Sequence, residues 1–394
     1  MDFNAFHRLL SPAGQAAMQA AEALAPREED YLRCFQELCR LFPADLARPA
    51  LEIAINRGKA EAKFPFAAQL YFSREALEQA SAWQVATYRA GRYRPFVSVL
   101  DLGCSAGSDT LALAGVTRVM GVDRDPLRLA LARANAEALS LGERTGFIQA
   151  DLRDPLPLGR LDNAALFFDP ARRAAGRRLH SVRAYQPPLE IVNTWLANFP
   201  ALGVKISPGV DLAELAPYAA EVEFISLDGE LKEAALWFGP LHSAVRRATL
   251  LPGEHTLAAA PAPALPLRQP GAYLYEPDPA VLRAGLVANL GEQIGAAQLD
   301  ADIAYLTADS RVATPFARLW QVEDWFPFSL KRLRATLRQR DVGQATVKKR
   351  GSPLQPEALL RDLRLSGSQE RVIFLTHLRG KPIAVIALPN PVSR

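Results

Sequence analysis

The residues Val99-Leu-Asp-Leu-Gly-Cys-Ser-Ala-Gly-Ser-Asp109 carry the most specific pattern in this sequence. They continue an apolar run that starts at Phe96, and their glycines come where a strand would turn tightly into a helix. The spacing is Asp-x-Gly-x-x-x-Gly, whereas the fingerprint Gly-x-Gly-x-x-Gly points helix N–H groups at a pyrophosphate. Because the carboxylate of Asp101 would repel a pyrophosphate, the pattern suits a ligand that carries an ammonium group. A glycine-rich turn without a ligand is the competing interpretation.

Short apolar segments and helical patterns alternate around this stretch, which is typical of βαβ units and a mostly parallel sheet. We expect strands at 96–102, 118–122, 145–149, 163–168 and 203–207. A helix with Asp125 as N-cap and Pro126 as its first residue should follow the second strand and stop at Gly142. Two alternating runs, 221–227 and 230–238, are joined by Asp228-Gly229, a strong hairpin signal. The pattern therefore predicts an α/β fold, a Rossmann-like sheet of parallel strands that ends in an antiparallel hairpin.

The remaining segments predict three further parts. Residues 1–95 have helical patterns, with capping serines at Ser11, before Pro12, and at Ser73. Residues 252–271 contain five prolines, which favour a linker or an extended edge segment. We therefore expect an N-terminal helical domain at 1–95, a sheet domain at 96–245, a linker or edge segment at 246–271 and a small C-terminal α/β domain at 272–394.

The small C-terminal domain should begin with one helix, because apolar residues recur there every four positions. These residues are Leu282, Leu286, Leu290 and Ile294. A strand at 303–307, a basic helix near 328–339, a helix near 356–363 and a final hairpin follow.

Composition excludes several classes of protein. With 49% hydrophobic and 22% charged residues, the 394-residue chain is neither disordered nor fibrous. No apolar run approaches the roughly 20 residues of a membrane span, and the first residues do not resemble a secretory signal. Three cysteines and five histidines show no metal-ligand spacing, so we expect no metal site. The default expectation is a soluble cytoplasmic enzyme.

Acidic residues end each of the first three predicted strands, at the edge where ligands bind in such sheets. Asp101 suits an ammonium group, Asp123 can accept both hydroxyls of a ribose, and Asp151 can accept an adenine amino group while the N–H of Leu152 reaches a ring nitrogen. S-adenosylmethionine carries all of these groups together with a sulfonium, and we expect it as the cofactor. The expected cofactor-binding residues are Asp101, Gly103, Ser105, Gly107, Asp123, Arg124, Asp151 and Leu152.

The fourth predicted strand ends in Asp169-Pro170-Ala171-Arg172. Methyl transfer to an exocyclic amine needs an acceptor that holds the amine, orients its lone pair and offsets developing positive charge. The carboxylate of Asp169 and the carbonyl of Pro170 can do this, with Arg172 placed at the base or at a phosphate. We therefore expect Asp169, Pro170 and Arg172 to be catalytic, whereas a plain proline turn is the alternative.

Basic residues gather in two segments that suit a polyanion. The block 172–183 holds five arginines without an acidic residue, and residues 331–350 hold eight basic residues against one acidic residue. In both segments the alternative is a solvated, arginine-rich surface. The residues expected to contact RNA are Arg173, Arg177, Arg178, Lys331, Arg334, Arg338, Lys348, Lys349 and Arg350.

These motifs together resemble the class I S-adenosylmethionine-dependent methyltransferases, in whose sheet the last strand inserts antiparallel beside the fifth. The whole arrangement is similar to the bacterial family whose C-terminal part is described as a THUMP-like domain. The likeness there is carried by Gly271-Ala-Tyr-Leu-Tyr-Glu-Pro-Asp-Pro279, by Lys349-Arg350-Gly351 and by the final hairpin. Because THUMP domains bind RNA, the resemblance implies an RNA partner, either rRNA or tRNA.

A second resemblance concerns the segment before the sheet. Lys63-Phe64, Tyr71-Phe72-Ser73 and Tyr88-Arg-Ala-Gly-Arg92 are similar to the helical lead-in of trimethylguanosine synthases, which methylate the exocyclic N2 of a guanine. The likeness implies that Phe64 and Phe72 lie near the cofactor and the substrate. In that family a second proline and an aromatic residue stand where this chain has Ala171 and Arg172.

We therefore predict an S-adenosylmethionine-dependent methyltransferase that acts on a base nitrogen of rRNA or tRNA, most simply an exocyclic amine such as guanine N2. One alternative is a methyltransferase of protein or small-molecule amines or amides. Another is a non-catalytic RNA-binding assembly factor, which the Ala171-Arg172 departure favours. An NAD-linked oxidoreductase is disfavoured by the glycine spacing and the antiparallel hairpin.

Overall fold

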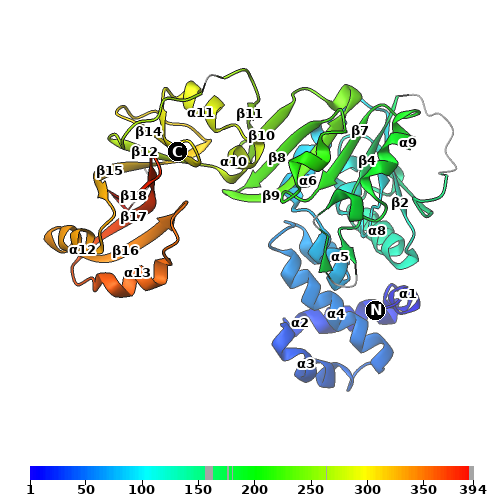
Figure 1. Cartoon of the computed structure of the whole chain (residues 1–394). Helices are drawn as coiled ribbons and strands as arrows, with labels where there is room; N and C mark the ends of the chain where they lie inside the picture. Colours follow the sequence, from blue (N-terminus) through cyan, green and yellow to red (C-terminus); the bar gives the residue numbers. More distant parts are fainter. Residues whose placement is uncertain (156–162, 175–176, 180, 263, 390–394) are drawn as a thin grey trace. The chain divides into compact units, whose positions relative to one another are not determined.

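The computed structural model describes residues 1–155, 163–174, 177–179, 181–262 and 264–389 (Figure 1). The chain divides into two compact units. The first consists of Met1–Glu221 and Glu233–Ser243, and the second of Val222–Lys232 and Ala244–Arg394. Each unit is therefore described separately.

Helices make up the first part of the first unit, as predicted. They are α1 (Phe3–Leu9), α2 (Pro12–Ala23), α3 (Tyr31–Leu38), α4 (Ala44–Ala60), α5 (Arg74–Gln79) and α6 (Trp83–Gly91). Both predicted caps are confirmed, because Ser11 Oγ accepts from Gly14 N at 3.2 Å and Ser73 Oγ accepts from Ala76 N at 3.2 Å. These side chains satisfy N–H groups that the first turns of α2 and α5 leave without helical partners.

A nine-stranded sheet follows, in the order β11-β10-β8-β9-β7-β4-β1-β2-β3. Its strands are β1 (Ser98–Leu102), β2 (Arg118–Asp123), β3 (Thr145–Gln149), β4 (Ala164–Phe168), β7 (Leu202–Ile206), β8 (Glu221–Leu227), β9 (Glu230–Phe238), β10 (Arg246–Leu251) and β11 (His255–Ala258). The strands β3, β2, β1, β4 and β7 are parallel, and β9 pairs antiparallel with β7. All five predicted parallel strands and the Asp228-Gly229 hairpin are confirmed.

The crossovers place α7 (Ser108–Ala114), α8 (Pro126–Ala138) and α9 (Val192–Leu196) between strands. Asp125 caps α8 as predicted, since its Oδ1 accepts from Leu127 N at 2.8 Å. The predicted end of α8 was wrong: the helix stops at Ala138, four residues before Gly142. The chain leaves the helical path earlier because Ser140 takes the left-handed conformation, with φ 57°. A short antiparallel pair, β5 (Arg173–Ala174) and β6 (Arg177–Arg178), lies beyond β4.

In the second unit, part of the proline-rich region forms strands. Strand β10 pairs parallel with β8, and β11 pairs antiparallel with β10. Residues 246–258 thus extend the sheet at its edge.

A seven-stranded sheet forms the rest of the second unit, in the order β13-β14-β12-β15-β18-β17-β16. Its elements are β12 (Tyr273–Pro277), α10 (Pro279–Ala284), α11 (Val287–Gln293), β13 (Ala297–Asp300), β14 (Ile303–Ala308), β15 (Ala317–Pro327), α12 (Leu330–Gln339), β16 (Val342–Lys349), α13 (Pro356–Leu363), β17 (Gln369–Leu378) and β18 (Lys381–Ala387). The single helix predicted over 282–294 is instead two helices, because Gly285 adopts φ 70° and ends α10. The predicted basic helix, the helix near 356–363 and the final hairpin are confirmed.

Candidate active site

The glycine-rich loop joins the end of β1 to α7 by a route that needs glycine at two positions. Gly103 and Gly107 adopt φ 85° and 84°, in the left-handed region. The N–H groups of Gly103 and Cys104 both donate to the carbonyl of Val122, at 2.8 and 3.1 Å. A Cβ on Gly103 would lie 2.7 Å from the carbonyl oxygen of Asp169. The loop and the residue that follows β4 are therefore in backbone contact.

Asp101 lies fully buried at the end of β1. Its Oδ2 accepts from Thr110 Oγ1 at 2.5 Å, while its Oδ1 is buried without a partner among the described residues. Burial, and next the charge of Asp109, raise the pKa of Asp101 to about 8. The carboxyl is therefore mostly protonated at neutral pH. A cation placed beside it would favour the charged form.

Asp123 ends β2 and holds the loop in place. Its Oδ2 accepts from Ser105 N at 2.9 Å, and its Oδ1 accepts from Asp125 N at 3.0 Å. Asp125 itself caps α8, so the two neighbouring acids have separate tasks, as the sequence indicated. The hydroxyl of Ser105 is buried without a hydrogen-bond partner in the described part of the chain.

The third predicted acid, Asp151, follows β3 and pairs with Arg153, whose Nη2 lies 2.5 Å from Asp151 Oδ2. Hydrogen bonds from the Arg153 side chain and backbone hold the pKa of Asp151 well below its usual range. Leu152 is buried. Arg124 is exposed, and its carbonyl accepts from Gln149 Nε2 at 3.1 Å.

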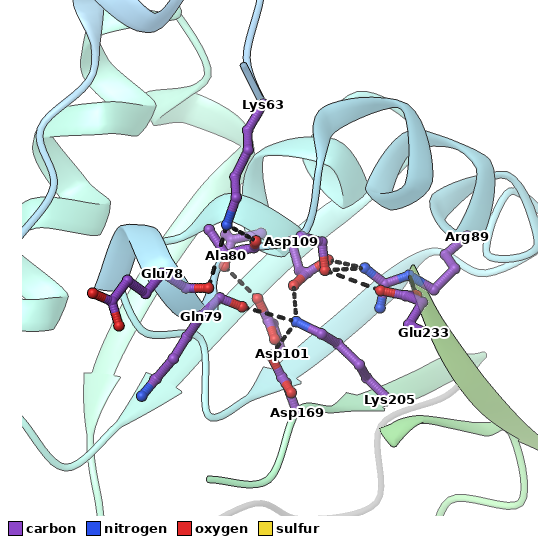
Figure 2. A network of polar contacts seen from close by, with 12 residues as sticks. Lys63, Glu78, Gln79, Ala80, Arg89, Asp101, Asp109, Asp169, Lys205 and Glu233 are labelled. Atoms are coloured by element: carbon purple, nitrogen blue, oxygen red, sulfur yellow. Dashed lines mark hydrogen bonds and ion pairs between the residues drawn. The ribbon is translucent and has the colours of Figure 1, made fainter. Parts of the chain in front are cut away.

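Asp169 lies beside the loop and is held by a buried lysine (Figure 2). Its backbone N–H donates to Leu102 O at 3.1 Å, which continues the pairing of β4 with β1. Its Oδ2 accepts from Nζ of Lys205, on β7, at 2.7 Å. The same Nζ donates to Gln79 O at 3.3 Å and lies 3.8 Å from Oδ2 of Asp109. One ammonium thus joins the end of β4, the end of α5 and the first turn of α7.

A second buried cation, Arg89 on α6, shares Asp109 with Lys205 (Figure 2). Nη2 of Arg89 donates to Asp109 Oδ1 and, at 2.9 Å, to Ser81 Oγ. Nε of Arg89 lies 2.9 Å from Glu233 Oε1, an ion pair without well-aligned hydrogen-bond geometry. Burial lowers the pKa of Arg89, but the charges of Asp109 and Glu233 outweigh it and hold that pKa above its usual value. Burial also raises the pKa of Glu233.

Arg172 is partly exposed, and its carbonyl accepts from Leu179 N at 2.7 Å. Its charge lowers the pKa of Glu233, the least of the effects on that group. Pro170 is buried, and its carbonyl accepts no hydrogen bond from any described residue. The side chains of Arg173, Arg177 and Arg178 lie outside what the structure describes, so their predicted role stays a prediction.

Comparison with known proteins identifies the family. Three domain families match the chain: a domain of unknown function over residues 2–60, a methyltransferase domain over 99–181 and a THUMP domain-like family over 317–389. Two relatives, from Mycobacterium tuberculosis strains CDC 1551 / Oshkosh and ATCC 25618 / H37Rv, are each named as an uncharacterized S-adenosylmethionine-dependent methyltransferase. Each is 37% identical over 316 residues, which span 79% of this chain and 85% of the relative. The chain belongs to the S-adenosylmethionine-dependent methyltransferases.

A solved structure supports the fold of this methyltransferase along almost its whole length. A protein from Porphyromonas gingivalis W83, assigned as a methyltransferase, superposes with a TM-score of 0.80 at 22% identity. The match covers 98% of this chain and 99% of that one.

Three structural observations indicate that the residues of this site fit S-adenosylmethionine. Oδ1 of Asp101 and Oγ of Ser105 are buried polar atoms without partners in the described part of the chain. The cradle at Gly103 has no room for a side chain. Asp101, Ser105 and Asp123 would hold the donor beside Asp169.

Four charged residues of this site were not predicted from the sequence: Arg89, Asp109, Lys205 and Glu233. Lys205 had a usable signal, because it is the one charged residue in the predicted strand 203–207. A lysine in a buried strand needs a partner, although the sequence does not name it. Lys63 Nζ donates to the carbonyls of Leu77 and Ala80 at 2.7 and 2.8 Å, and so fixes the end of α5.

The expected contact of Phe64 and Phe72 with the substrate was wrong. Each ring is 1% exposed, and the two stack with their centroids 5.2 Å apart in the core of the helical part. Neither presents a free face to a base. These rings support the lead-in by packing instead.

The basic residues of α12 differ in their surroundings. Lys331 and Arg338 are exposed. Arg334 donates from Nε to Asp362 O at 3.1 Å, at the end of α13, so it joins two helices. Leu333 and Leu337 are buried beneath the helix, whereas Leu330 is partly buried.

The basic run at 348–350 lies at the end of β16, which stops at Lys349. Lys348 Nζ lies 2.5 Å from Glu276 Oε2 and 5.2 Å from the ring centroid of Trp320. The Arg350 guanidinium lies 5.0 Å from the ring centroid of Tyr305. Both side chains are half-buried and already contact protein groups, and their role in RNA binding stays a prediction. Lys349 is exposed and donates to Gln355 Oε1 at 3.1 Å.

Among the residues that the structure describes, no group of three or more His, Cys, Asp or Glu side chains could hold a metal ion. In the same part of the chain, no helix is both long and apolar enough to cross a membrane.

Proposed function

We propose that this methyltransferase modifies a base nitrogen in RNA, most simply an exocyclic amine in rRNA or tRNA. One observation carries the proposal. Asp169-Pro170 lies at the end of β4, with the backbone of Asp169 against Gly103 of the loop. An acceptor held by Asp169 and Pro170 would therefore lie next to the methyl donor.

Two oxygens can hold the amine there. Oδ2 of Asp169 is taken by Lys205, whereas Oδ1 has no hydrogen-bond donor among the described residues. The carbonyl of Pro170 is likewise without a donor in that part of the chain. An –NH₂ group that donates one hydrogen to each oxygen has its lone pair directed away from both. Guanine N2 is the specific acceptor that the lead-in resemblance favours.

Methyl transfer from a sulfonium requires little acid–base catalysis by the protein. S-adenosylmethionine supplies an electrophilic methyl group on a sulfonium. As the nitrogen forms its bond to carbon, the electron pair of the C–S bond goes to sulfur and positive charge develops on the amine. The Asp169 carboxylate offsets this charge and can receive the proton that the nitrogen loses, before water takes it.

The RNA part of the proposal is supported by the THUMP domain-like match over residues 317–389 and by the exposed cations on α12. Lys331 and Arg338 are available for phosphates, which give protein–RNA affinity its electrostatic part.

The test compares modified nucleosides in total RNA from a deletion strain, its parent, and deletion strains that express wild-type protein or Asp169→Ala. We expect one methylated nucleoside to disappear on deletion and to return with wild type only. The mass and retention time of that nucleoside give the base and atom. If no nucleoside changes while a methylated protein residue or metabolite disappears, the substrate is not RNA.

A further inference from the structure

Lys205 is a buried lysine in the middle of a catalytic sheet, and packing alone does not account for it. The residue is 2% exposed and belongs to β7, where its neighbours Val204 and Ile206 are fully buried. A charged ammonium in such surroundings persists only when its partners compensate for the lost water. Its partners therefore indicate its task.

The ammonium contacts oxygens from three parts of the chain. It donates hydrogen bonds to Asp169 Oδ2 at 2.7 Å and Gln79 O at 3.3 Å, and it forms a longer ion pair with Asp109 Oδ2 at 3.8 Å. These contacts engage the buried ammonium with protein oxygens, and the group that it shares with the proposed reaction is Asp169. We therefore expect it to act on the reaction through the groups that it holds.

The shortest of these contacts fixes the orientation of the proposed acceptor carboxylate. With Oδ2 engaged, the carboxylate of Asp169 cannot rotate freely, and Oδ1 is the oxygen left for an amine. The Asp169 side chain is 20% exposed and that of Lys205 3%, so solvent reaches the pair mainly at Asp169. The contact with Gln79 also ties the end of α5, the lead-in helix, to the same ammonium.

We propose that Lys205 is a positioning residue for methyl transfer: it holds Oδ2 of Asp169 so that Oδ1 receives the acceptor amine, and it ties the lead-in to that carboxylate. This inference rests on the proposed function, because it takes Asp169 as the acceptor group. It predicts that loss of Lys205 slows the chemical step while binding of the methyl donor survives.

The experiment measures transfer of labelled methyl groups from S-adenosylmethionine to total RNA from the deletion strain. Lys205→Met keeps the length of the side chain without its charge, and we expect kcat to fall about 100-fold, the scale for a misplaced catalytic group. The dissociation constant of S-adenosylmethionine, measured by calorimetry, should change by less than about threefold, as should KM for RNA. Lys205→Arg keeps a cation at the carboxylate and should restore at least about a tenth of the wild-type kcat.

Lys63→Met is the matched control. Lys63 also holds lead-in carbonyls with a part-buried ammonium, because its Nζ donates to the carbonyls of Leu77, Glu78 and Ala80. We expect this variant to melt at a lower temperature and to keep kcat within about threefold of wild type. If it loses as much kcat as Lys205→Met, the effect comes from the lead-in and not from Asp169, and the proposal is overturned.

A double-mutant cycle separates this inference from the proposed function. If Lys205 acts through Asp169, Lys205→Met combined with Asp169→Asn should be no slower than Asp169→Asn alone. Multiplicative losses of kcat would overturn the inference and leave the RNA activity standing. If wild-type protein labels no RNA, the proposed function fails, and the same cycle is read from melting temperatures. Additive melting shifts would then overturn the inference as well, because they would show that the two side chains are not coupled.

Discussion

Replacing Asp101 by Asn should change how the stability of the protein depends on pH. Burial raises the pKa of Asp101 to about 8, against 3.8 for the free group. The folded state therefore binds the proton more tightly than the unfolded chain does. The raised pKa of Asp101 therefore stabilises the folded state fully below pH 4. This stabilisation is lost as the pH rises through 8. Linkage with these two values gives a loss of about 3–4 kcal/mol between pH 5 and pH 8.

Asn has the shape of the protonated carboxyl, keeps a partner for Thr110 and does not titrate. Urea unfolding at pH 5 and pH 8, followed by circular dichroism, gives the free energy of unfolding of both proteins. Between pH 5 and pH 8, we expect the free energy of unfolding of Asp101→Asn to increase by about 3–4 kcal/mol relative to that of wild type. The reason is that all other groups titrate alike in the two proteins. Parallel pH profiles would show that Asp101 is ionised in the folded protein, and the explanation by burial would be refuted.

Three further predictions concern ligands. Asp123→Ala should weaken S-adenosylmethionine binding by about 1.5–3 kcal/mol in calorimetry, the scale of hydrogen bonds to a charged group; unchanged affinity in a folded variant would contradict the ribose assignment. Asp169→Ala should keep most of this affinity but lower methyl transfer about 10²- to 10³-fold, whereas full activity would make Asp169 structural. Lys331→Ala with Arg338→Ala should reduce the salt slope of RNA binding by up to about two. A Lys232→Ala variant, on β9, is the control, and an unchanged slope in the double variant would mean that α12 has only a solvated face.

The strands and turns of the first sheet could be predicted because their causes are local. A buried parallel strand is a short apolar run, and a left-handed turn needs glycine, so Gly103 and the Asp228-Gly229 hairpin are visible in the sequence. The predicted helix over 282–294 failed at Gly285. An uninterrupted spacing of apolar residues does not show whether a glycine continues a helix or ends it.

The charged network of the site could not be predicted because its members are far apart in the chain. Lys205 meets Asp169 across 36 positions and Gln79 across 126. A parallel strand is covered on both faces, which indicates that Lys205 is buried, but only the packing of α5, α7 and β4 decides which oxygens surround it. The same holds for Lys348, whose partner Glu276 lies 72 positions away.

The charges of this network affect how the acceptor site binds the methyl donor. Arg89 and Lys205 bring two positive charges against the carboxylates of Asp109, Asp169 and Glu233, while Asp101 is mostly neutral at pH 7 because its pKa is near 8. Asp169 is the most exposed of the three carboxylates, so its negative charge is the one best placed to act on a bound ligand. S-adenosylmethionine carries a net positive charge through its sulfonium, and its demethylated product does not. The carboxylate of Asp169 therefore attracts the donor more than the product, which favours release of the product after transfer.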